Sequence, residues 1–249
     1  LLIMEEMRLR PYKKDFSLSY TQGVFPTLEL IENRPASLVR IYLSEKGRTN
    51  AGVEKIKKFS KESGIPALFD DRSIQRSGAK ENCFALGVFN KYEDTLDFTA
   101  DHLVLVNPAD MGNLGTILRT AAAFGIYNLA IISPAADIFD PKVIRASMGA
   151  LFHLRFQYFD SFAQYQASAK KRRYIPFMLD GRPISALTFT EEDARIPFSL
   201  IFGNESSGLP ASLSEVGTPV RIIHLDTVDS LNLPTAVGIG LYHFTKYNG

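Results

Sequence analysis

The chain has 249 residues, of which 45% are apolar and 22% are charged, a composition typical of folded globular proteins. A disordered chain would be poorer in apolar residues, and a membrane span would need a run of about 18 apolar residues, which this sequence lacks. The 28 basic and 27 acidic residues give a net charge of +1, which neither demands nor excludes binding to nucleic acid.

The single cysteine and the histidines limit the chemistry that the chain can carry. Cys83 stands alone, which excludes an internal disulfide framework and a paired-cysteine metal knuckle. A reduced, cytoplasmic setting fits this cysteine usage best. The four histidines show no metal-ligand spacing, so we expect no metal site.

Residues 1–98 mix short apolar runs with amphipathic segments. Val53, Ile56 and Phe59 follow the spacing of one helix face, with lysines between them. The predicted strands cover residues 38–43, 66–69 and 83–89, and the predicted helices cover residues 53–59 and 71–77. We therefore expect a small α/β domain over residues 1–98, which ends in the polar stretch 91–97.

Residues 99–249 alternate strands and helices more clearly. The strands are predicted at residues 103–106, 129–132, 153–158, 174–179, 199–202 and 221–225, and the helices at residues 114–124, from 141 onward and at 234–246. Such alternation predicts a parallel sheet with helices on both faces. Ligands of such sheets bind outside the carboxyl ends of the strands, so the loops at that edge are the places to search.

The first of these loops leads from a buried strand into a helix. Asn113 and Gly115 are expected to open this helix and to leave unpaired amides, which suit an anion. Arg119 follows six residues after Asn113, on a different face, and an arginine there can hold a phosphate with two hydrogen bonds. A capped helix with a surface arginine explains the same residues.

Two further loops carry small and polar residues. Gly203 and Gly208 permit close backbone approach, and Glu205 between them could orient a donor or act as a base. Ser230 and Asn232 precede the last predicted helix and are candidate caps or site residues. A glycine-rich turn and ordinary helix capping are the simpler interpretations of these two loops.

Taken together, the three loops resemble the motifs of the SpoU (TrmH-like) family of S-adenosylmethionine-dependent RNA methyltransferases, part of the SPOUT class. The first motif is Asn113-Leu-Gly-Thr-Ile-Leu-Arg119, the second runs from Leu200 to Leu209, and the third is Ser230-Leu231-Asn232. Each motif alone is weak, but their order and spacing agree with the family over residues 101–247.

The resemblance implies a fold and an assembly. The fold is α/β, with a C-terminal SPOUT-type parallel sheet that carries a deep trefoil knot over residues 99–249. A small α/β domain that binds the RNA substrate precedes it, over residues 1–98. The resemblance also implies a homodimer, for which the interface, or the core beneath it, would use Ile117, Val237, Leu241 and Phe244.

The resemblance further implies methyl transfer to a ribose 2′-hydroxyl of ribosomal or transfer RNA. The cofactor S-adenosylmethionine would be held by Gly203, Ile222 and Leu231. The catalytic residues would be Arg119, Asn113, Glu205, Ser230 and Asn232, with Arg119 acting through a neighbouring phosphate, because a guanidinium keeps its charge at neutral pH.

The sequence departs from the family just before the third motif. Ile223 and His224 stand where the family commonly has Pro and Met, and Asp226 replaces a glycine. Two alternatives stay open beside ribose methylation, and these changes are the reason for the second of them. One is a methyltransferase that acts on a base nitrogen, and the other is an RNA-binding module that has lost the cofactor.

Overall fold

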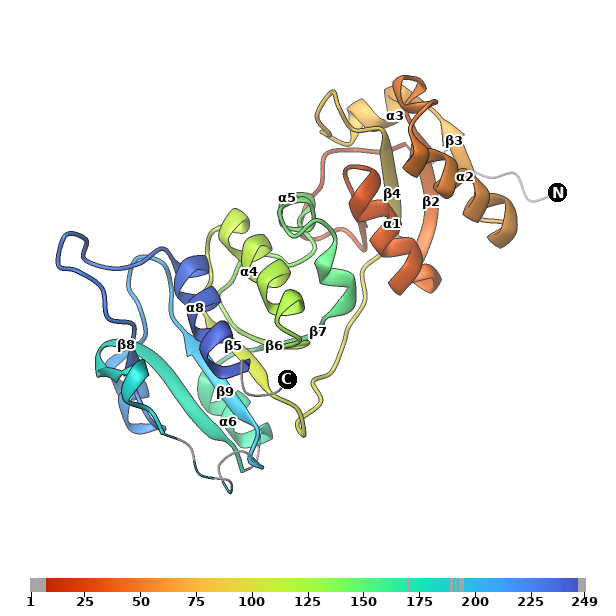
Figure 1. The fold of residues 1–249 in the computed structure, drawn as a ribbon. Coiled ribbons are helices and arrows are strands. Elements are labelled where there is room, and N and C mark those ends of the chain that lie inside the picture. Colours follow the sequence, from red (N-terminus) through yellow and green to blue (C-terminus); the bar gives the residue numbers. More distant parts are fainter. Residues whose placement is uncertain (1–7, 170, 189, 191, 193–194, 246–249) are drawn as a thin grey trace. The chain divides into compact units, whose positions relative to one another are not determined.

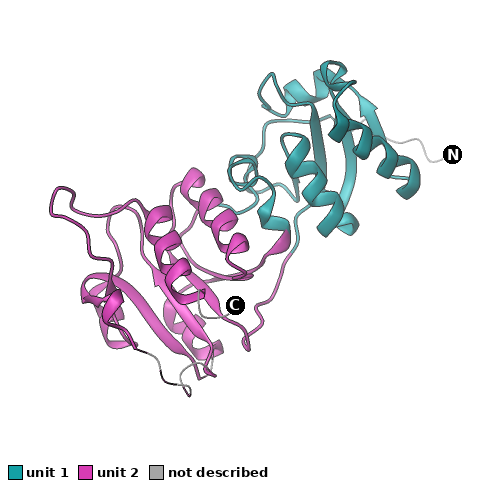
Figure 2. Ribbon diagram, in the orientation of Figure 1, with its two compact units in different colours: residues 1–92, 137–152 teal, residues 93–136, 153–249 magenta. Residues whose placement is uncertain are grey.

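The computed structural model describes residues 8–169, 171–188, 190, 192 and 195–245, and these fold as two compact units. The first unit comprises residues 1–92 and 137–152, and the second comprises residues 93–136 and 153–249 (Figure 2). The chain therefore passes from one unit to the other three times. Residues 137–152 belong to the first unit, whereas the predicted division at residue 98 assigns them to the second domain.

The first unit is built on a four-stranded mixed sheet with the order β1-β4-β2-β3, in which only the β2–β3 pair is parallel. Its strands are β1 (Leu18–Tyr20), β2 (Leu38–Leu43), β3 (Ala67–Phe69) and β4 (Ala85–Asn90). Its helices are α1 (Val24–Asn33), α2 (Ala51–Ser63), α3 (Asp71–Arg76) and α5 (Pro141–Ala146).

Helix α2 shows how the sequence sets an element of this unit. The Asn50 side chain caps the helix by accepting hydrogen bonds from the amides of Gly52 and Val53. Gly64 ends the helix in the left-handed conformation, with φ of 75°. In contrast, β1 and α1 were not predicted, because β1 has only three residues and no side chain caps the start of α1.

The second unit is built on a six-stranded sheet, parallel throughout, with the order β10-β8-β9-β5-β6-β7. Its strands are β5 (His102–Val106), β6 (Asn128–Ile132), β7 (Arg155–Phe159), β8 (Arg173–Pro183), β9 (Phe198–Phe202) and β10 (Val220–Arg221). Its described α-helices are α4 (Met111–Ala123), α6 (Phe162–Ser168) and α8 (Leu233–Thr245). The parallel α/β sheet predicted from the alternation is thus confirmed.

Both faces of this sheet are covered by helices. Helices α4 and α8 pack against each other on one face, and α6 packs against β6 and β7 from the other (Figure 1). Every residue of β5, β6 and β9 is buried, as the continuous apolar runs predicted. No described helix of either unit is long and apolar enough to cross a membrane.

Some element boundaries differ from the sequence predictions. The strand predicted over 221–225 is confined to Val220–Arg221, because the chain then leaves the sheet as an exposed loop. The strand predicted from residue 153 begins at Arg155, because a 3-10 turn occupies Ala150–His153. Four more 3-10 turns are described, at Pro35–Ser37, Glu45–Gly47, Ile184–Ala186 and Ala211–Glu215.

A buried polar network joins β5 and β9 at their amino ends. His102 Nε2 lies 2.9 Å from the Asp97 carbonyl, which can only accept, so this nitrogen carries the proton. His102 Nδ1 then accepts from the Tyr165 hydroxyl at 2.9 Å, and that hydroxyl lies 2.6 Å from Ser199 Oγ. Arg172 completes the network by donating to Ser199 Oγ at 2.8 Å.

Burial sets the protonation states in this network. It lowers the pKa of His102 to about 4 and raises the pKa of Tyr165 to about 12, so both side chains are neutral at neutral pH. The network lies at the sheet edge opposite to the carboxyl ends of the strands. We therefore assign it a structural role.

Candidate active site

The loops that follow β5 and β9 begin side by side. Parallel pairing places Leu105 next to Phe202 near the carboxyl ends of the two strands. The loop after β5 starts at Asn107, and the side-chain amide of Asn204 donates to the Asn107 carbonyl at 2.8 Å. The first two motifs are therefore joined directly at the edge of the sheet where ligands of such sheets bind.

Glu205 makes the second connection between these loops. Its carboxylate accepts from the backbone amides of Ala109 at 3.2 Å and Asp110 at 3.1 Å. It also accepts from the side-chain amide of Asn113 at 3.3 Å. Two of the predicted catalytic residues, Glu205 and Asn113, are thus brought together, and the carboxylate has its partners within the chain rather than facing solvent alone.

The start of helix α4 differs from the prediction. The helix begins at Met111 rather than near Leu114, and Asp110 is its N-cap. The Asp110 carboxylate accepts from the amide of Asn113 at 2.7 Å, so this amide is not left for an external anion. The expectation that Asn113 opens the helix with unpaired amides was wrong, because two carboxylates of the chain itself occupy that end.

A cavity of about 420 Å³ lies beside the second and third motifs. The predicted cofactor residues Gly203, Ile222 and Leu231 all line it, as do Glu205 and Ser230. Under the last helix, the rings of Phe177 and Phe202 stack with their centroids 4.1 Å apart. Both phenylalanines line the cavity, so it combines an apolar wall with the backbone of two motif loops.

Gly203 shows why this wall requires glycine. A Cβ atom at this position would lie 2.2 Å from the carbonyl carbon of Gly208 and 2.4 Å from the amide nitrogen of Leu209. Asn204 and Gly208 exchange two backbone hydrogen bonds, of 3.2 and 2.9 Å, and Gly208 has φ of 67°. The second motif is therefore a tight turn whose backbone faces the cavity.

The other predicted catalytic residues lie apart from the cavity or make no side-chain contact. Arg119 is exposed on α4 and does not line the cavity. Asn232 is exposed, and its carbonyl accepts from the Ala236 amide at 3.0 Å, which begins α8. Ser230 lines the cavity, but its hydroxyl has no hydrogen bond within the described part of the chain. Capping by the side chains of Ser230 and Asn232 is not seen.

Sequence reasoning missed several residues of this site. Asn204 links the loops, and its position inside the second motif was the available signal. Asp180 and His224 also line the cavity, and the sequence signal for His224 was its place beside the third motif. The His224 Nδ1 donates to the Leu225 carbonyl at 3.1 Å.

The cavity fits a nucleoside cofactor in size and chemistry. Small-molecule sites occupy about 300–1,000 Å³ and combine apolar walls with a few polar groups. The stacked phenylalanines offer an apolar surface to a base, while the backbone at Gly203 and Ile222 offers hydrogen-bonding groups. No three His, Cys, Asp or Glu side chains gather as metal ligands do within the described residues.

Comparison with known proteins identifies the family. A family model, described as the SpoU rRNA Methylase family, matches residues 101–242. The chain belongs to this family. The matched residues contain β5, the three motif loops and most of α8, so the resemblance based on the motifs is confirmed.

Individual relatives agree with this assignment. An uncharacterized tRNA/rRNA methyltransferase of Synechocystis is 37% identical over 141 residues, covering 56% of this chain and 51% of that protein. A 23S rRNA (uridine(2479)-2′-O)-methyltransferase of Streptomyces viridochromogenes is 35% identical over 149 residues, covering 56% and 50%. The matches thus span about half the length of these two relatives.

A solved structure extends the likeness to both units. The SpoU methyltransferase AviRb of Streptomyces viridochromogenes, in complex with AdoMet, superposes with a TM-score of 0.77. It covers 93% of this chain and 91% of that one, at 20% sequence identity. At this identity, the likeness establishes the fold.

Proposed function

We propose that this protein transfers a methyl group from S-adenosylmethionine to a ribose 2′-hydroxyl of ribosomal or transfer RNA. The observation that carries the proposal is the convergence of Gly203, Ile222 and Leu231 on one cavity next to the Glu205 loop. Family membership and the 2′-O activity in the name of the Streptomyces relative support the same reaction.

S-adenosylmethionine supplies a methyl group on a sulfonium, which leaves as a neutral thioether. The chain has to hold this cofactor, and the backbone at Gly203, Ile222 and Leu231 would do so beside the stacked Phe177 and Phe202 rings. Glu205 acts on the loops rather than on the hydroxyl, because its carboxylate is engaged by two amides and Asn113. It keeps the first motif next to the cavity.

Arg119 is the residue that we assign to the RNA. It is exposed, and it has no hydrogen bond or ion pair within the described part of the chain. A planar guanidinium binds a phosphate with two hydrogen bonds, so Arg119 would fix the nucleotide while the 2′-hydroxyl takes the methyl group and its proton passes to solvent water. Ser230 and Asn232, whose side chains are also free among the described residues, would position the ribose.

The first unit is proposed to bind the RNA substrate. Residues 1–92 and 137–152 hold 18 basic and 13 acidic residues, a net charge of +5. The second unit holds 10 basic and 14 acidic residues, a net charge of −4. This asymmetry is stronger than a division at residue 98 gives, because the acidic residues 93–97 fall outside the first unit. A positive unit attracts the phosphate backbone.

We also propose a symmetric homodimer. The candidates Ile117, Val237, Leu241 and Phe244 are buried within the chain, so they are core and not interface. Instead, Tyr242 on α8 is 63% exposed and Leu225 in the loop before α8 is 78% exposed. Exposed apolar side chains of this size mark a contact surface, and a second copy is the commonest occupant. Light scattering of wild type and of Tyr242→Glu tests both claims. Wild type should be a dimer and the variant a monomer. A monomeric wild type would contradict the dimer, and a variant that stays dimeric would contradict this interface.

The trefoil knot and the cytoplasmic location belong to the proposal as well. Strand β10 lies at the edge of the sheet, yet α8, which follows it, packs against β9 and α4 across the position of β8. A return of this kind is part of a knotted path. The buried single cysteine, Cys83, whose thiol pKa burial raises to about 11, fits a reduced compartment.

Two measurements test the proposed reaction. Calorimetric titration with S-adenosylhomocysteine should show one saturable site, and Gly203→Ala should abolish it, because the added Cβ meets the Gly208 backbone. Nuclease digestion and mass analysis of RNA from cells with and without the protein should then reveal one 2′-O-methylated nucleotide. A methylated base would favour base methylation, and binding of RNA without cofactor would favour the non-catalytic alternative.

A further inference from the structure

Residues 137–152 are an integral part of the first unit, although they lie between β6 and β7 of the second unit in sequence. The Phe139 ring packs against Phe89 and Tyr92, with centroid distances of 6.0 and 5.0 Å. The Phe152 ring packs edge-on against Phe89 at 5.4 Å. Ser19 Oγ donates to the Phe139 carbonyl at 2.5 Å, so the segment is fixed by polar as well as apolar contacts.

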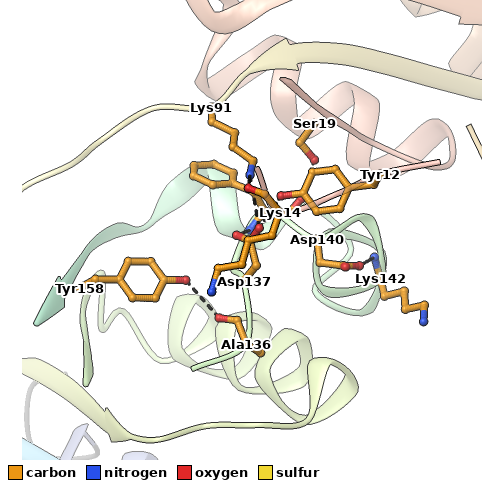
Figure 3. A network of polar contacts seen from close by, with 10 residues as sticks. Tyr12, Lys14, Ser19, Lys91, Ala136, Asp137, Asp140, Lys142 and Tyr158 are labelled. Carbon is orange, nitrogen blue, oxygen red and sulfur yellow. Dashed lines mark hydrogen bonds and ion pairs between the residues drawn. The ribbon is translucent and has the colours of Figure 1, made fainter. Parts of the chain in front are cut away.

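A polar clasp holds the first residue of this segment. The Tyr12 hydroxyl donates to the Asp137 carboxylate, and Lys91 Nζ lies 3.3 Å from Asp137 Oδ2 (Figure 3). The side chains of Lys91 and Asp137 are 18% and 13% exposed, so this ion pair is largely withdrawn from water. Lys91 also donates to the Lys14 carbonyl at 2.8 Å and lies over the Tyr12 ring at 4.8 Å.

Ala136, which precedes Asp137 in the chain, is held within the second unit. Its amide donates to the Pro108 carbonyl at 2.8 Å, and its carbonyl accepts from the Tyr158 hydroxyl at 3.2 Å. Asn107, beside Pro108, donates to the Ile132 carbonyl at 3.0 Å. The peptide bond between Ala136 and Asp137 is therefore anchored at both ends.

A continuous series of hydrogen bonds leads from this peptide bond to the cavity. Pro108 belongs to the first-motif loop, whose Asn107 carbonyl accepts from Asn204 and whose Ala109 and Asp110 amides donate to Glu205. Asn204 and Glu205 both line the cavity. A displacement of Asp137 would therefore be transmitted to the cavity through its peptide bond to Ala136, the hydrogen bond from Ala136 to Pro108, the backbone of the first-motif loop, and the hydrogen bonds of that loop to Glu205.

We propose that Asp137, held by Tyr12 and Lys91, is a positioning residue that couples the first unit to the first-motif loop and to Glu205. RNA bound by the first unit would then change the position of the first-motif loop and of Glu205, and the peptide bond between Ala136 and Asp137 would transmit this change. The statement about methyl transfer rests on the proposed function, whereas the coupling of Asp137 to the loop does not.

The test compares Asp137→Asn with wild type in two assays. Asn keeps the oxygen that accepts from the Phe139 amide at 3.0 Å but loses the charge that pairs with Lys91. Amide hydrogen exchange of Asn107 and Ala136, measured by NMR without any RNA, should be about tenfold faster in the variant. The rate of methyl transfer to bound RNA should fall about tenfold, while S-adenosylhomocysteine affinity changes less than about twofold.

Asp70→Asn is the matched control. Asp70 also lies in the first unit and accepts from Ser73 Oγ at 2.6 Å. It is remote in sequence from the three peptide bonds at which the chain passes from one unit to the other. This variant should leave the exchange of Asn107 and Ala136 and the rate of methyl transfer unchanged. Tyr12→Phe, which removes only one donor to Asp137, should shift both readouts in the direction of Asp137→Asn.

Each result decides the proposal. Unchanged exchange at Asn107 and Ala136 in Asp137→Asn would overturn it, as would an equal change in Asp70→Asn. Faster exchange together with a wild-type transfer rate would remove the positioning role. If wild type shows no methyl transfer at all, the proposed function fails, and faster exchange in Asp137→Asn alone would still establish the coupling.

Discussion

The buried His102 predicts how the stability of the second unit depends on pH. Burial lowers its pKa from 6.5 to about 4, so the folded state keeps the ring neutral while the unfolded state takes up a proton below pH 6.5. Between these two values the unfolded state binds more protons, and the free energy of unfolding must fall as the pH falls. The effect is absent above about pH 7.

The size of the effect follows from the two pKa values. A tenfold change in proton affinity is worth about 1.4 kcal/mol, so a fall of the pKa from 6.5 to about 4 corresponds to roughly 3 kcal/mol. His102 has no exposed surface, so solvent screening does not reduce this figure much. A loss of about 3 kcal/mol is a large part of the 5–15 kcal/mol that stabilises a typical domain.

Urea unfolding followed by circular dichroism at pH values from 7.5 to 4.5 measures this slope. In His102→Gln, which retains a donor for the Asp97 carbonyl, the slope should be smaller by about one bound proton. Tyr165→Phe is the control, because it removes the bond to Nδ1 but leaves His102 buried and should keep the slope. Equal slopes in wild type and His102→Gln would refute the reasoning.

Three further predictions follow from the site and from the first unit. Arg119→Ala and Arg119→Lys should each lower methyl transfer by about 100-fold, because the point charge of a lysine does not replace the planar guanidinium. The affinity for S-adenosylhomocysteine should stay unchanged, because Arg119 lies away from the cavity. Near-full activity of the lysine variant would contradict the role of Arg119. Replacing Lys55 and Lys61 of α2 by serine should lower the salt dependence of RNA affinity by up to about two phosphate contacts. Replacing Lys57 and Lys58, which pair with glutamates at 2.7 and 3.8 Å, should change it less. An unchanged salt dependence in the Lys55 and Lys61 variant would show that α2 is ordinary surface. Deletion of residues 1–92 should yield a protein that aggregates or binds a hydrophobic dye, because Phe139 and Phe152 lose the partners that bury them. A well-folded, monodisperse product would contradict this prediction and show that residues 137–152 pack in another way.

The fold of the second unit was predictable because its strands are buried on both faces. Residues 103–106, 129–132 and 200–202 are continuous apolar runs, and such runs separated by helices leave few arrangements other than a parallel sheet. The cavity was predictable in part. Gly203, Ile222 and Leu231 were assigned through the motifs, and they line one cavity, although their roles toward a ligand are still predictions.

The place of residues 137–152 was not predictable from local patterns. Phe139, Val143 and Phe152 indicate a buried segment, but an apolar pattern does not specify which sheet buries it. The helix over 141–146 was expected from Asp140 and Pro141, and it exists, but as part of the other unit. Only the contacts with Phe89, Tyr92 and Tyr12, which are distant in sequence, decide the question.

The start of α4 illustrates a different limit. Both Asp110 and Asn113 are good N-cap residues, and a sequence pattern does not choose between two caps three positions apart. The choice has a functional consequence. With Asp110 as the cap, the amides of residues 109, 110 and 113 donate to the carboxylates of Glu205 and Asp110, and no amide among these three is left for a phosphate.

The anion-binding capacity of this helix end is thus used to join the first two motifs. Carboxylates there satisfy the helix dipole and the unpaired amides together, and they bring net negative charge to the edge where RNA must arrive. An incoming phosphate therefore needs a cation that stands clear of Glu205. Arg119 is the residue that we propose for this role, since it lies nine residues after the cap, exposed, and without an ion pair among the described residues. In the proposed function the same helix separates the two tasks, because its first turn fixes the loops and its third turn would present the guanidinium to RNA.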